Sequence, residues 1–140
     1  MLSESLIEIR DHTGPDYKPL VDYQSWRVAL MNYTDDLTPD KINRMQKHTE
    51  TDEVFVLMSG RCILFIGEGD ESVANVHAMD MELYKLYNVK RGVWHSHTFS
   101  RDARVLIVEN RDTVAGNSPF VGLSADQQRE VVELANKLWK

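Results

Sequence analysis

The sequence predicts an all-β barrel or sandwich followed by one C-terminal α-helix. Most of the chain consists of short runs of β-branched, aromatic and aliphatic residues separated by turn residues, as in sandwiches and barrels. The clearest pair of runs, 53–58 and 61–66, flanks the two-residue turn Ser59-Gly60, which is typical of a β-hairpin. The last segment instead begins with a helix-capping pattern and continues with apolar residues at helical spacing.

The first third of the chain predicts two strands and a short helical segment. Residues 6–9 form the first predicted strand, and the polar stretch 11–15 is the turn after it. Residues 26–33 have the composition of a second strand. Thr38-Pro39 places a capping residue before a proline at the first helical position, so a helical turn or irregular segment is expected as far as Met45.

Three more strands are expected after the hairpin, over residues 82–87, 94–99 and 104–109, while residues 72–80 fit no single pattern. The C-terminal helix is expected over about 124–139. Its start is a capping box between Ser124 and Gln127. Its apolar face consists of Val131, Val132, Leu134, Leu138 and Trp139. We expect this face to pack on the outside of the sheet or on a partner subunit.

Length and composition indicate one domain over residues 1–140, with a barrel core over about 26–110. The formal net charge of -6 argues against nucleic acid or an anionic membrane as a partner. Cys62 is the only cysteine, so neither an internal disulfide nor a cysteine-rich zinc module is expected. The N-terminus lacks the features of a signal peptide, and the apolar runs are too short to cross a bilayer. A cytoplasmic protein is the simplest interpretation.

Two segments gather imidazoles and a carboxylate beside turn glycines. In the first, His48, Glu53 and Gly60 stand in the pattern H-x4-E-x6-G. The second contains His95 and His97, which point to the same face of a strand because they are two residues apart. Glu53 lies an odd number of positions from His48, so the two converge only if the polar stretch between them bends.

Imidazole nitrogen and carboxylate oxygen are the donors that divalent transition ions such as Zn, Fe, Ni, Co and Mn accept. Two histidines and one carboxylate leave open positions on such an ion for water or substrate. Burial of several polar side chains in a small barrel is costly unless they are paired or coordinated. The two segments therefore predict a common pocket with a divalent metal.

The same residues resemble the two motifs of the cupin family. His48, Glu53 and Gly60 match the first motif, G-x5-H-x-H-x3-4-E-x6-G, while Gly92 and His95 match the second, G-x5-P-x-G-x2-H-x3-N. The likeness to a small single-domain cupin covers roughly residues 26–110. It implies a double-stranded β-helix, that is, a jelly-roll barrel, in an all-β fold. Gly-Val-Trp-His at 92–95 is also similar to a segment of ureidoglycolate lyase-like cupins.

The chain departs from the motifs at several positions. Gln46 occupies the place of the first histidine, Asp40 that of the first glycine, Lys90 that of the proline and Phe99 that of the closing asparagine. These departures weaken the metal prediction more than the fold prediction.

The resemblance implies the metal ligands His48, Glu53 and His95, with Gln46 as a weak fourth. His97 has no ligand position in the family but shares the predicted face of His95. It can replace the missing histidine, act as a catalytic base, or simply be a hydrogen-bonded barrel histidine. Arg91 is a candidate for binding a substrate carboxylate, with an ordinary exposed arginine as the alternative.

The predicted function is a divalent-metal-dependent enzyme, of lyase or isomerase type, that acts on a small oxygen-rich metabolite. The alternative is a non-catalytic cupin module that binds a small molecule or a metal. A third interpretation is an interaction subunit whose pocket is filled by side chains. The C-terminal helix and the early strands offer surfaces for a homodimer.

Overall fold

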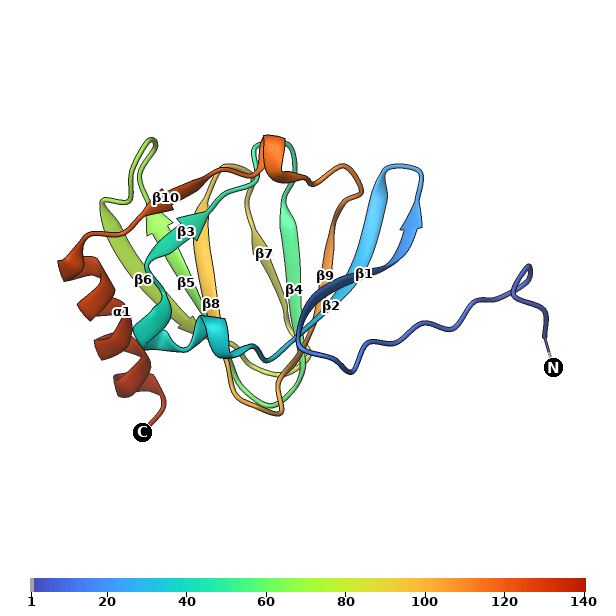
Figure 1. The fold of residues 1–140 in the computed structure, drawn as a ribbon, viewed down its shortest axis with the longest axis horizontal. Coiled ribbons are helices and arrows are strands. Elements are labelled where there is room, and N and C mark those ends of the chain that lie inside the picture. The colour runs from blue at the N-terminus through green and yellow to red at the C-terminus, as the bar shows by residue number, and fades with distance from the viewer. Residues whose placement is uncertain (1) are drawn as a thin grey trace.

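The computed structural model describes residues 2–140, in which ten strands form two five-stranded antiparallel sheets that face each other (Figure 1). Sheet A has the strand order β1-β2-β9-β4-β7, and sheet B has the order β10-β3-β8-β5-β6. The strands of sheet A are β1 (Asp16–Tyr23), β2 (Trp26–Asn32), β9 (Arg104–Asn110), β4 (Glu53–Ser59) and β7 (Leu86–Val89). Those of sheet B are β10 (Phe120–Gly122), β3 (Arg44–Gln46), β8 (Trp94–Phe99), β5 (Cys62–Glu68) and β6 (Asn75–Asp80).

Successive strands alternate between the two sheets along most of the chain. The chain passes from β2 in sheet A to β3 in sheet B, returns with β4, and crosses again between β4 and β5 and at every connection from β6 to β10. This alternation winds the chain into a jelly-roll barrel. The predicted all-β jelly roll with a C-terminal helix is therefore confirmed.

One end of the barrel interior is closed by apolar side chains, and the other end remains polar. Phe55 and Leu57 of β4, Leu64 of β5, and Val105 and Ile107 of β9 are almost completely buried between the sheets. They stand at alternate positions of their strands, because successive side chains point to opposite faces. The same alternation places Glu53 and Glu109 on the inner face, at the polar end.

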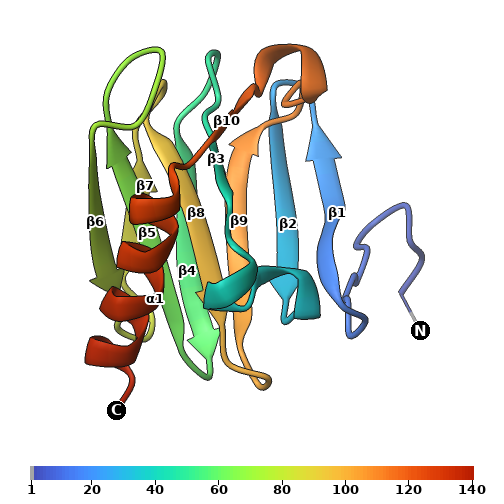
Figure 2. The ribbon, with the colours of Figure 1, turned by 60° about the vertical axis from the view of Figure 1, so that its left-hand side comes forward.

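The C-terminal helix α1 (Ala125–Leu138) lies over the outer face of sheet B (Figure 2). Its buried residues Val131 and Ala135 belong to a second core that includes Ile63 and Phe65 of β5. The predicted capping box is present, since Ser124 Oγ accepts a hydrogen bond of 3.1 Å from the Gln127 N–H and Gln127 Oε1 accepts one of 3.0 Å from the Ser124 N–H. Of the two predicted positions, the helix occupies the outside of the sheet.

The two predicted strands around Ser59-Gly60 are present as β4 and β5, but they enter different sheets and do not pair with each other, so the predicted hairpin is wrong. Gly60 has a φ of 70°, in the left-handed region that favours glycine. A Cβ atom at this position would lie 2.6 Å from the backbone nitrogen of Ala103. The turn therefore requires glycine for its conformation and for its close contact.

The first predicted strand was wrong, β1 was missed, and the strand predicted over residues 82–87 was misplaced. Residues 6–9 form no strand, and the chain first enters a sheet at residue 16. Strand β1 was missed because it contains Pro19. The missing N–H of this proline is tolerated because the strand lies at a sheet edge and has an irregularity beside the proline. Residues 82–85 are not extended, since Tyr84 has a φ of 64° and β7 begins only at Leu86.

Three short 3-10 helices complete the fold: η1 (Asp35–Leu37), η2 (Pro39–Lys41) and η3 (Ala115–Asn117). The helical or irregular segment predicted from Pro39 to Met45 begins with η2, but its last two residues belong to strand β3, which was not anticipated. The undecided stretch 72–80 contains strand β6, and β10 was not anticipated. In the part of the chain that the structure describes, no helix is long and apolar enough to cross a membrane.

Candidate metal centre

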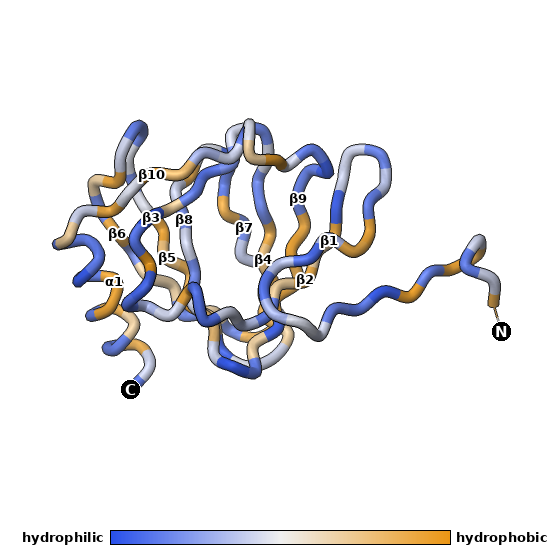
Figure 3. The backbone as a smooth tube through the Cα atoms, viewed as in Figure 1, coloured by the Kyte–Doolittle hydropathy of each residue, from blue (hydrophilic) through white to orange (hydrophobic). Residues whose placement is uncertain are grey.

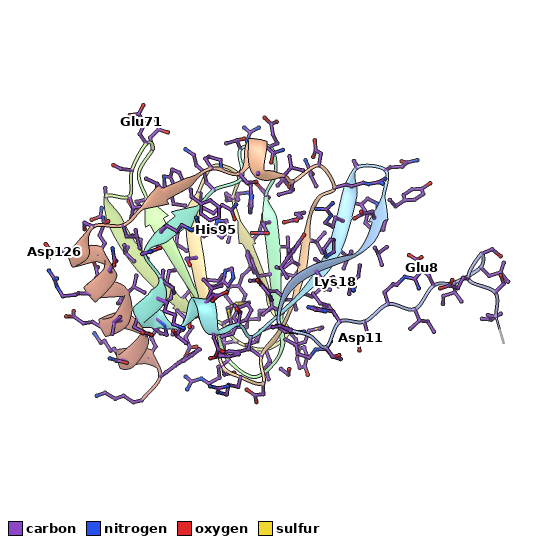
Figure 4. The ribbon with its side chains drawn as sticks, viewed as in Figure 1. Glu8, Asp11, Lys18, Glu71, His95 and Asp126 are labelled. Carbon is purple, nitrogen blue, oxygen red and sulfur yellow. The ribbon has the colours of Figure 1, made fainter. Side chains whose placement is uncertain are left out.

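Three buried side chains from different parts of the chain converge at the polar end of the barrel. His48 follows β3, Glu53 begins β4 and His95 lies in β8. One ligand atom of each lies within 4.8 Å of the other two. Nε2 of His48 lies 3.2 Å from Oε1 of Glu53, and Nε2 of His95 lies 3.0 Å from the same oxygen. In Figure 4 the labelled His95 lies within the barrel, far from the surface residues Glu71 and Asp126.

The chain crosses from sheet B to sheet A between His48 and Glu53, so strand alternation does not apply across this connection. The bend over residues 49–52 is fixed by backbone hydrogen bonds. Thr49 N–H donates to Asn117 at 2.9 Å, and the carbonyl of His48 accepts from Gly92 N–H at 2.8 Å. The second contact links the two histidine-containing segments directly. The bend required for His48 and Glu53 to meet is therefore present.

Both histidines are held by the ring nitrogen that faces away from Glu53. Nδ1 of His95 lies 3.1 Å from the carbonyl oxygen of Val93, which can only accept a hydrogen bond. Nδ1 of His48 lies 2.7 Å from Ser118 Oγ, whose own proton is donated to Asn117 Oδ1. Each ring therefore carries a proton on Nδ1, and its Nε2 is left facing the carboxylate.

Neutral imidazoles in these tautomers aim two lone pairs at one carboxylate oxygen. Such an arrangement is favourable only when positive charge lies among the three groups, either as protons on the rings or as a bound cation. Burial by itself would raise the pKa of Glu53, but the interactions of its carboxylate with His48 and His95 outweigh burial and hold this pKa well below its usual range. The three donor groups thus fit a divalent metal ion, and the hydrogen bonds at Nδ1 of both histidines orient the rings for it.

The three groups lie in the wall of a cavity of about 560 Å³ between the two sheets. Gln46 also lines this cavity from β3, where it pairs with His95 of β8. Its side-chain Nε2 donates a 3.0 Å hydrogen bond to the carbonyl of Ser118. This bond occupies the amide nitrogen and leaves the amide oxygen as the only donor atom that Gln46 can offer a metal.

His97 lines the same cavity one step deeper along β8. Its ring stacks on that of Phe99, with centroids 5.0 Å apart, and lies 5.9 Å from the ring of Phe55. Both ring nitrogens are buried and have no hydrogen-bond partner among residues 2–140. Burial and the neighbouring His95 lower the pKa of His97 to about 4, so the ring is neutral at pH 7. The hydrogen-bonded barrel histidine considered for this position is not observed.

Glu109 is a cavity residue that the sequence did not reveal. This buried carboxyl accepts a 2.6 Å hydrogen bond from the hydroxyl of Tyr17 and lies 3.9 Å from a guanidinium nitrogen of Arg27. Burial and the nearby Glu53 raise the pKa of Glu109 to about 8, so the group is protonated at pH 7. It is the last residue of the predicted strand 104–109. Its inward position, two residues after the buried Ile107, was the available signal.

Arg91 lies away from the cavity lining. Its side chain is exposed, and its backbone N–H donates a 2.7 Å hydrogen bond to Asp52 Oδ1. The arginines that do line the cavity are Arg27 and Arg44. A carboxylate-binding role for Arg91 thus has no support from its position.

No protein-family model matches the chain, and no curated protein matches its sequence. Solved structures share its fold at low identity. Pac13, from Streptomyces, described as a nucleoside dehydratase, is 12% identical over 83% of this chain and 87% of that chain, with a TM-score of 0.53. The capsular polysaccharide assembling protein CapF of Staphylococcus aureus is 11% identical over 87% of this chain and 34% of that one, with a TM-score of 0.57. A cupin-2 domain containing protein of Shewanella frigidimarina has 21% identity over 77% of this chain and 88% of that one, with a TM-score of 0.48.

The alternation of strands between two facing sheets, with the histidine-bearing segments brought together at one end, decides the fold. The chain has the cupin fold. Within the cupin barrel, the residues matched to the two motifs lie side by side: His48 and Glu53 from the first, and His95 from the second.

Proposed function

We propose that this cupin is a divalent-metal-dependent lyase that acts on a small oxygen-rich substrate. The observation that carries the proposal is the convergence of His48, Glu53 and His95, whose ligand atoms lie within 4.8 Å of one another in the wall of the cavity. These three residues would hold the metal. A bound ion would supply Lewis acidity, which stabilises negative charge on a carbonyl or hydroxyl oxygen of the substrate.

Glu109 is suited to be the proton donor. Its pKa of about 8 keeps the carboxyl protonated at pH 7, and it faces the cavity. In the elimination that we propose, a C–O bond of the substrate breaks and the proton of Glu109 passes to the departing oxygen, which leaves as water. Tyr17 positions Glu109 through its 2.6 Å hydrogen bond.

His97 is suited to accept the proton that leaves carbon. Its ring is neutral at pH 7, and neither nitrogen has a hydrogen-bond partner in the part of the chain that the structure describes. A base with a pKa of about 4 is weak, so it removes only a proton made acidic by an adjacent carbonyl group. We therefore restrict the substrate to a carbonyl compound with a hydroxyl group one carbon further along the chain.

Pac13 supports water elimination as a reaction for this barrel, because a dehydratase is a lyase and that protein has the same fold. The likeness at 12% identity concerns fold alone, so the substrate class rests on the cavity residues. The same acid and base can also move a proton within one substrate, which would be isomerase chemistry.

The first test is the metal content of the purified, untagged chain after reloading with Zn, Fe, Ni, Co or Mn. We expect about one ion per chain in the wild type and in His77→Ala, an exposed histidine outside the cavity. We expect its loss in His95→Ala and His48→Ala, because each removes one of three ligands. A wild type that binds no ion more tightly than His95→Ala contradicts the metal site.

The second test is turnover of β-hydroxy carbonyl compounds by the loaded protein, measured as formation of the unsaturated or rearranged product. A wild-type chain that holds the metal but transforms none of these compounds would indicate the non-catalytic binding module instead. Glu109→Gln separates the two functions, because it removes the proton donor and leaves the three ligands in place. We expect its kcat to fall about 100-fold or more at unchanged metal content.

A further inference from the structure

Arg44 is a cavity arginine without an anionic partner in the described chain. It lies in β3 two residues before Gln46, so the two side chains share one face of sheet B, and both line the cavity. Gln46 is half-buried, whereas Arg44 is exposed at the mouth of the cavity. Among residues 2–140 the Arg44 guanidinium contacts the ring of Phe120 but pairs with no carboxylate.

The other arginine of the cavity, Arg27, is already paired. Its Nε donates a 3.0 Å hydrogen bond to Oδ1 of Asp22, and a second nitrogen lies 3.9 Å from Oε2 of Glu109. The side chain of Arg27 is only 17% exposed. The cavity lining contains no lysine. Within the part of the chain that the structure describes, Arg44 is therefore the arginine that can pair with an anion from outside.

The ring of Phe120 holds the guanidinium of Arg44 in place. Phe120 lies in β10, which pairs with β3 at the edge of sheet B, and it also lines the cavity. The central carbon Cζ of Arg44 lies 3.7 Å from the centroid of the ring, so the cation lies over the aromatic face. This contact leaves the N–H donors of the guanidinium for a ligand. A side chain that is already held loses less conformational freedom when a ligand binds.

Deeper in the cavity, the wall formed by sheet A is apolar. Met31, Phe55 and Ile107 line it. Figure 3 shows hydrophobic stretches on their strands β2, β4 and β9. An apolar wall cannot compensate a buried negative charge, so an anionic end of a substrate is expected at the mouth, beside Arg44.

Two carboxylates, Asp16 and Asp36, also line the cavity, and both are exposed. Together with the net charge of -6, they oppose a general attraction of anions to this region. An anion is therefore held here only by direct hydrogen bonds to the Arg44 guanidinium. Such bonds favour a group with two adjacent oxygens, which a guanidinium binds in bidentate fashion.

We propose that Arg44 binds a carboxylate or phosphate group at the far end of the substrate. This inference rests on the proposed function, and it narrows the substrate to a β-hydroxy carbonyl compound that ends in an anion. Residues 44 and 46 are about 7 Å apart along an extended strand. Gln46 stands opposite His95 across the β3–β8 pair. The anion thus lies one short carbon chain away from the ligand residues.

The test uses short β-hydroxy ketones that differ only at the far end, which is a carboxylate, the methyl ester of that carboxylate, or a phosphate monoester. Their dissociation constants for the chelator-treated full chain are measured by calorimetry, so that neither metal nor turnover is required. We expect the wild type to bind one of the two anions at least about tenfold more tightly than the neutral ester. The anion that is preferred identifies the substrate class.

Substitutions of Arg44 show whether this residue causes the preference. Arg44→Gln should remove it, while Arg44→Lys should keep part of it, because lysine retains the charge but not the paired donors. Arg129→Gln changes an exposed arginine of α1 outside the cavity lining, so it should bind all three compounds as the wild type does. Because Arg44 is exposed, we expect the unfolding temperature of all these variants to match that of the wild type.

The metal-loaded protein gives a second measurement. Arg44 holds the substrate away from the reacting carbons, so Arg44→Gln should raise KM for the preferred anion about tenfold or more and change kcat less than about threefold. A residue needed only for the structure would not produce this separation of KM from kcat.

The inference and the proposed function fail in different ways. A wild type that binds the neutral ester as tightly as both anions overturns the inference, whatever its metal content. So does an Arg44→Gln variant that keeps the wild-type preference. A preference for the anion that depends on Arg44, in a chain that binds no metal and transforms none of the compounds, supports the anion site and refutes the proposed lyase.

Discussion

The hydroxyl of Tyr17 donates a 2.6 Å hydrogen bond to Oε2 of Glu109, although 92 residues separate the two along the chain. Tyr17 lies in β1 and Glu109 in β9, two strands that are separated by β2 in sheet A. Tyr17 and Glu109 line the same cavity as the histidines. They place a protonated carboxyl next to the ionised Glu53. Two acids with pKa values pushed in opposite directions are the arrangement that acid–base chemistry requires.

The raised pKa of Glu109 predicts that metal-free protein loses stability as pH rises toward 8. Between about pH 4.5 and 8 the folded state holds a proton on Glu109 that the unfolded state has released. The free energy of unfolding should therefore fall with pH there, by up to about 1.4 kcal/mol per pH unit from this group. Glu109→Gln should remove that slope in chelator-treated protein, measured by urea unfolding. The exposed Glu133→Gln is the control, and an unchanged slope in Glu109→Gln would contradict the assignment.

The lowered pKa of His97 predicts that stability changes with pH in the opposite direction. This pKa falls from 6.5 to about 4 on folding, so the unfolded state binds more protons between these values and stability should be lost as pH falls through them. His97→Phe keeps a stacked ring beside Phe99 and removes two buried nitrogens without partners. We expect metal-free His97→Phe to gain about 1–3 kcal/mol of stability at pH 5 and less at pH 7. A loss of stability at both pH values would show that the nitrogens have partners in solution.

A single substitution at Gln46 should strengthen metal binding. Gln46 lies opposite His95 across the β3–β8 pair and lines the cavity, but its amide nitrogen is occupied by Ser118. Gln46→His would place a stronger donor at the position where the cupin motif has its first histidine. We expect metal affinity to rise about tenfold or more, measured by competition with a chromogenic chelator. Gln46→Leu is the control, and equal affinity in all three proteins would place residue 46 outside the coordination sphere.

Removal of the Ser118 hydroxyl should lower the metal affinity, because this hydroxyl orients His48. The hydroxyl accepts the Nδ1 proton of His48 at 2.7 Å and thereby turns Nε2 toward Glu53. Ser118→Ala leaves this proton without its partner, so we expect metal affinity to fall about 10- to 100-fold while one ion per chain still binds at saturation. Ser100→Ala, a serine of the β8–β9 turn, is the control. Wild-type affinity in Ser118→Ala would mean that His48 is oriented by other contacts.

Local patterns were sufficient for most of the elements. The two strands on either side of Gly60 and the capped helix at Ser124 were predicted correctly, because both depend on neighbouring residues. Their pairing as a hairpin was wrong, because β4 and β5 join different sheets. Strand β1 was missed because its sequence contains Pro19, which only the edge position of the strand makes acceptable. Residues 6–9 have the composition of a strand but form none, and their side chains are exposed, because alternating apolar residues alone do not supply a partner strand.

The sequence by itself determined the cupin barrel, its helix, and the three residues that meet at its polar end. Motif spacing and turn chemistry depend on residues that are close together in the sequence, so both can be recognised without the structure. Only the tertiary structure decided what surrounds those three residues: Ser118 behind His48, Glu109 beside Glu53, and His97 deeper in the same cavity. The reason is physical, since these relationships join strands that lie far apart in the chain, and the pKa of a buried group is set by neighbours that only folding supplies.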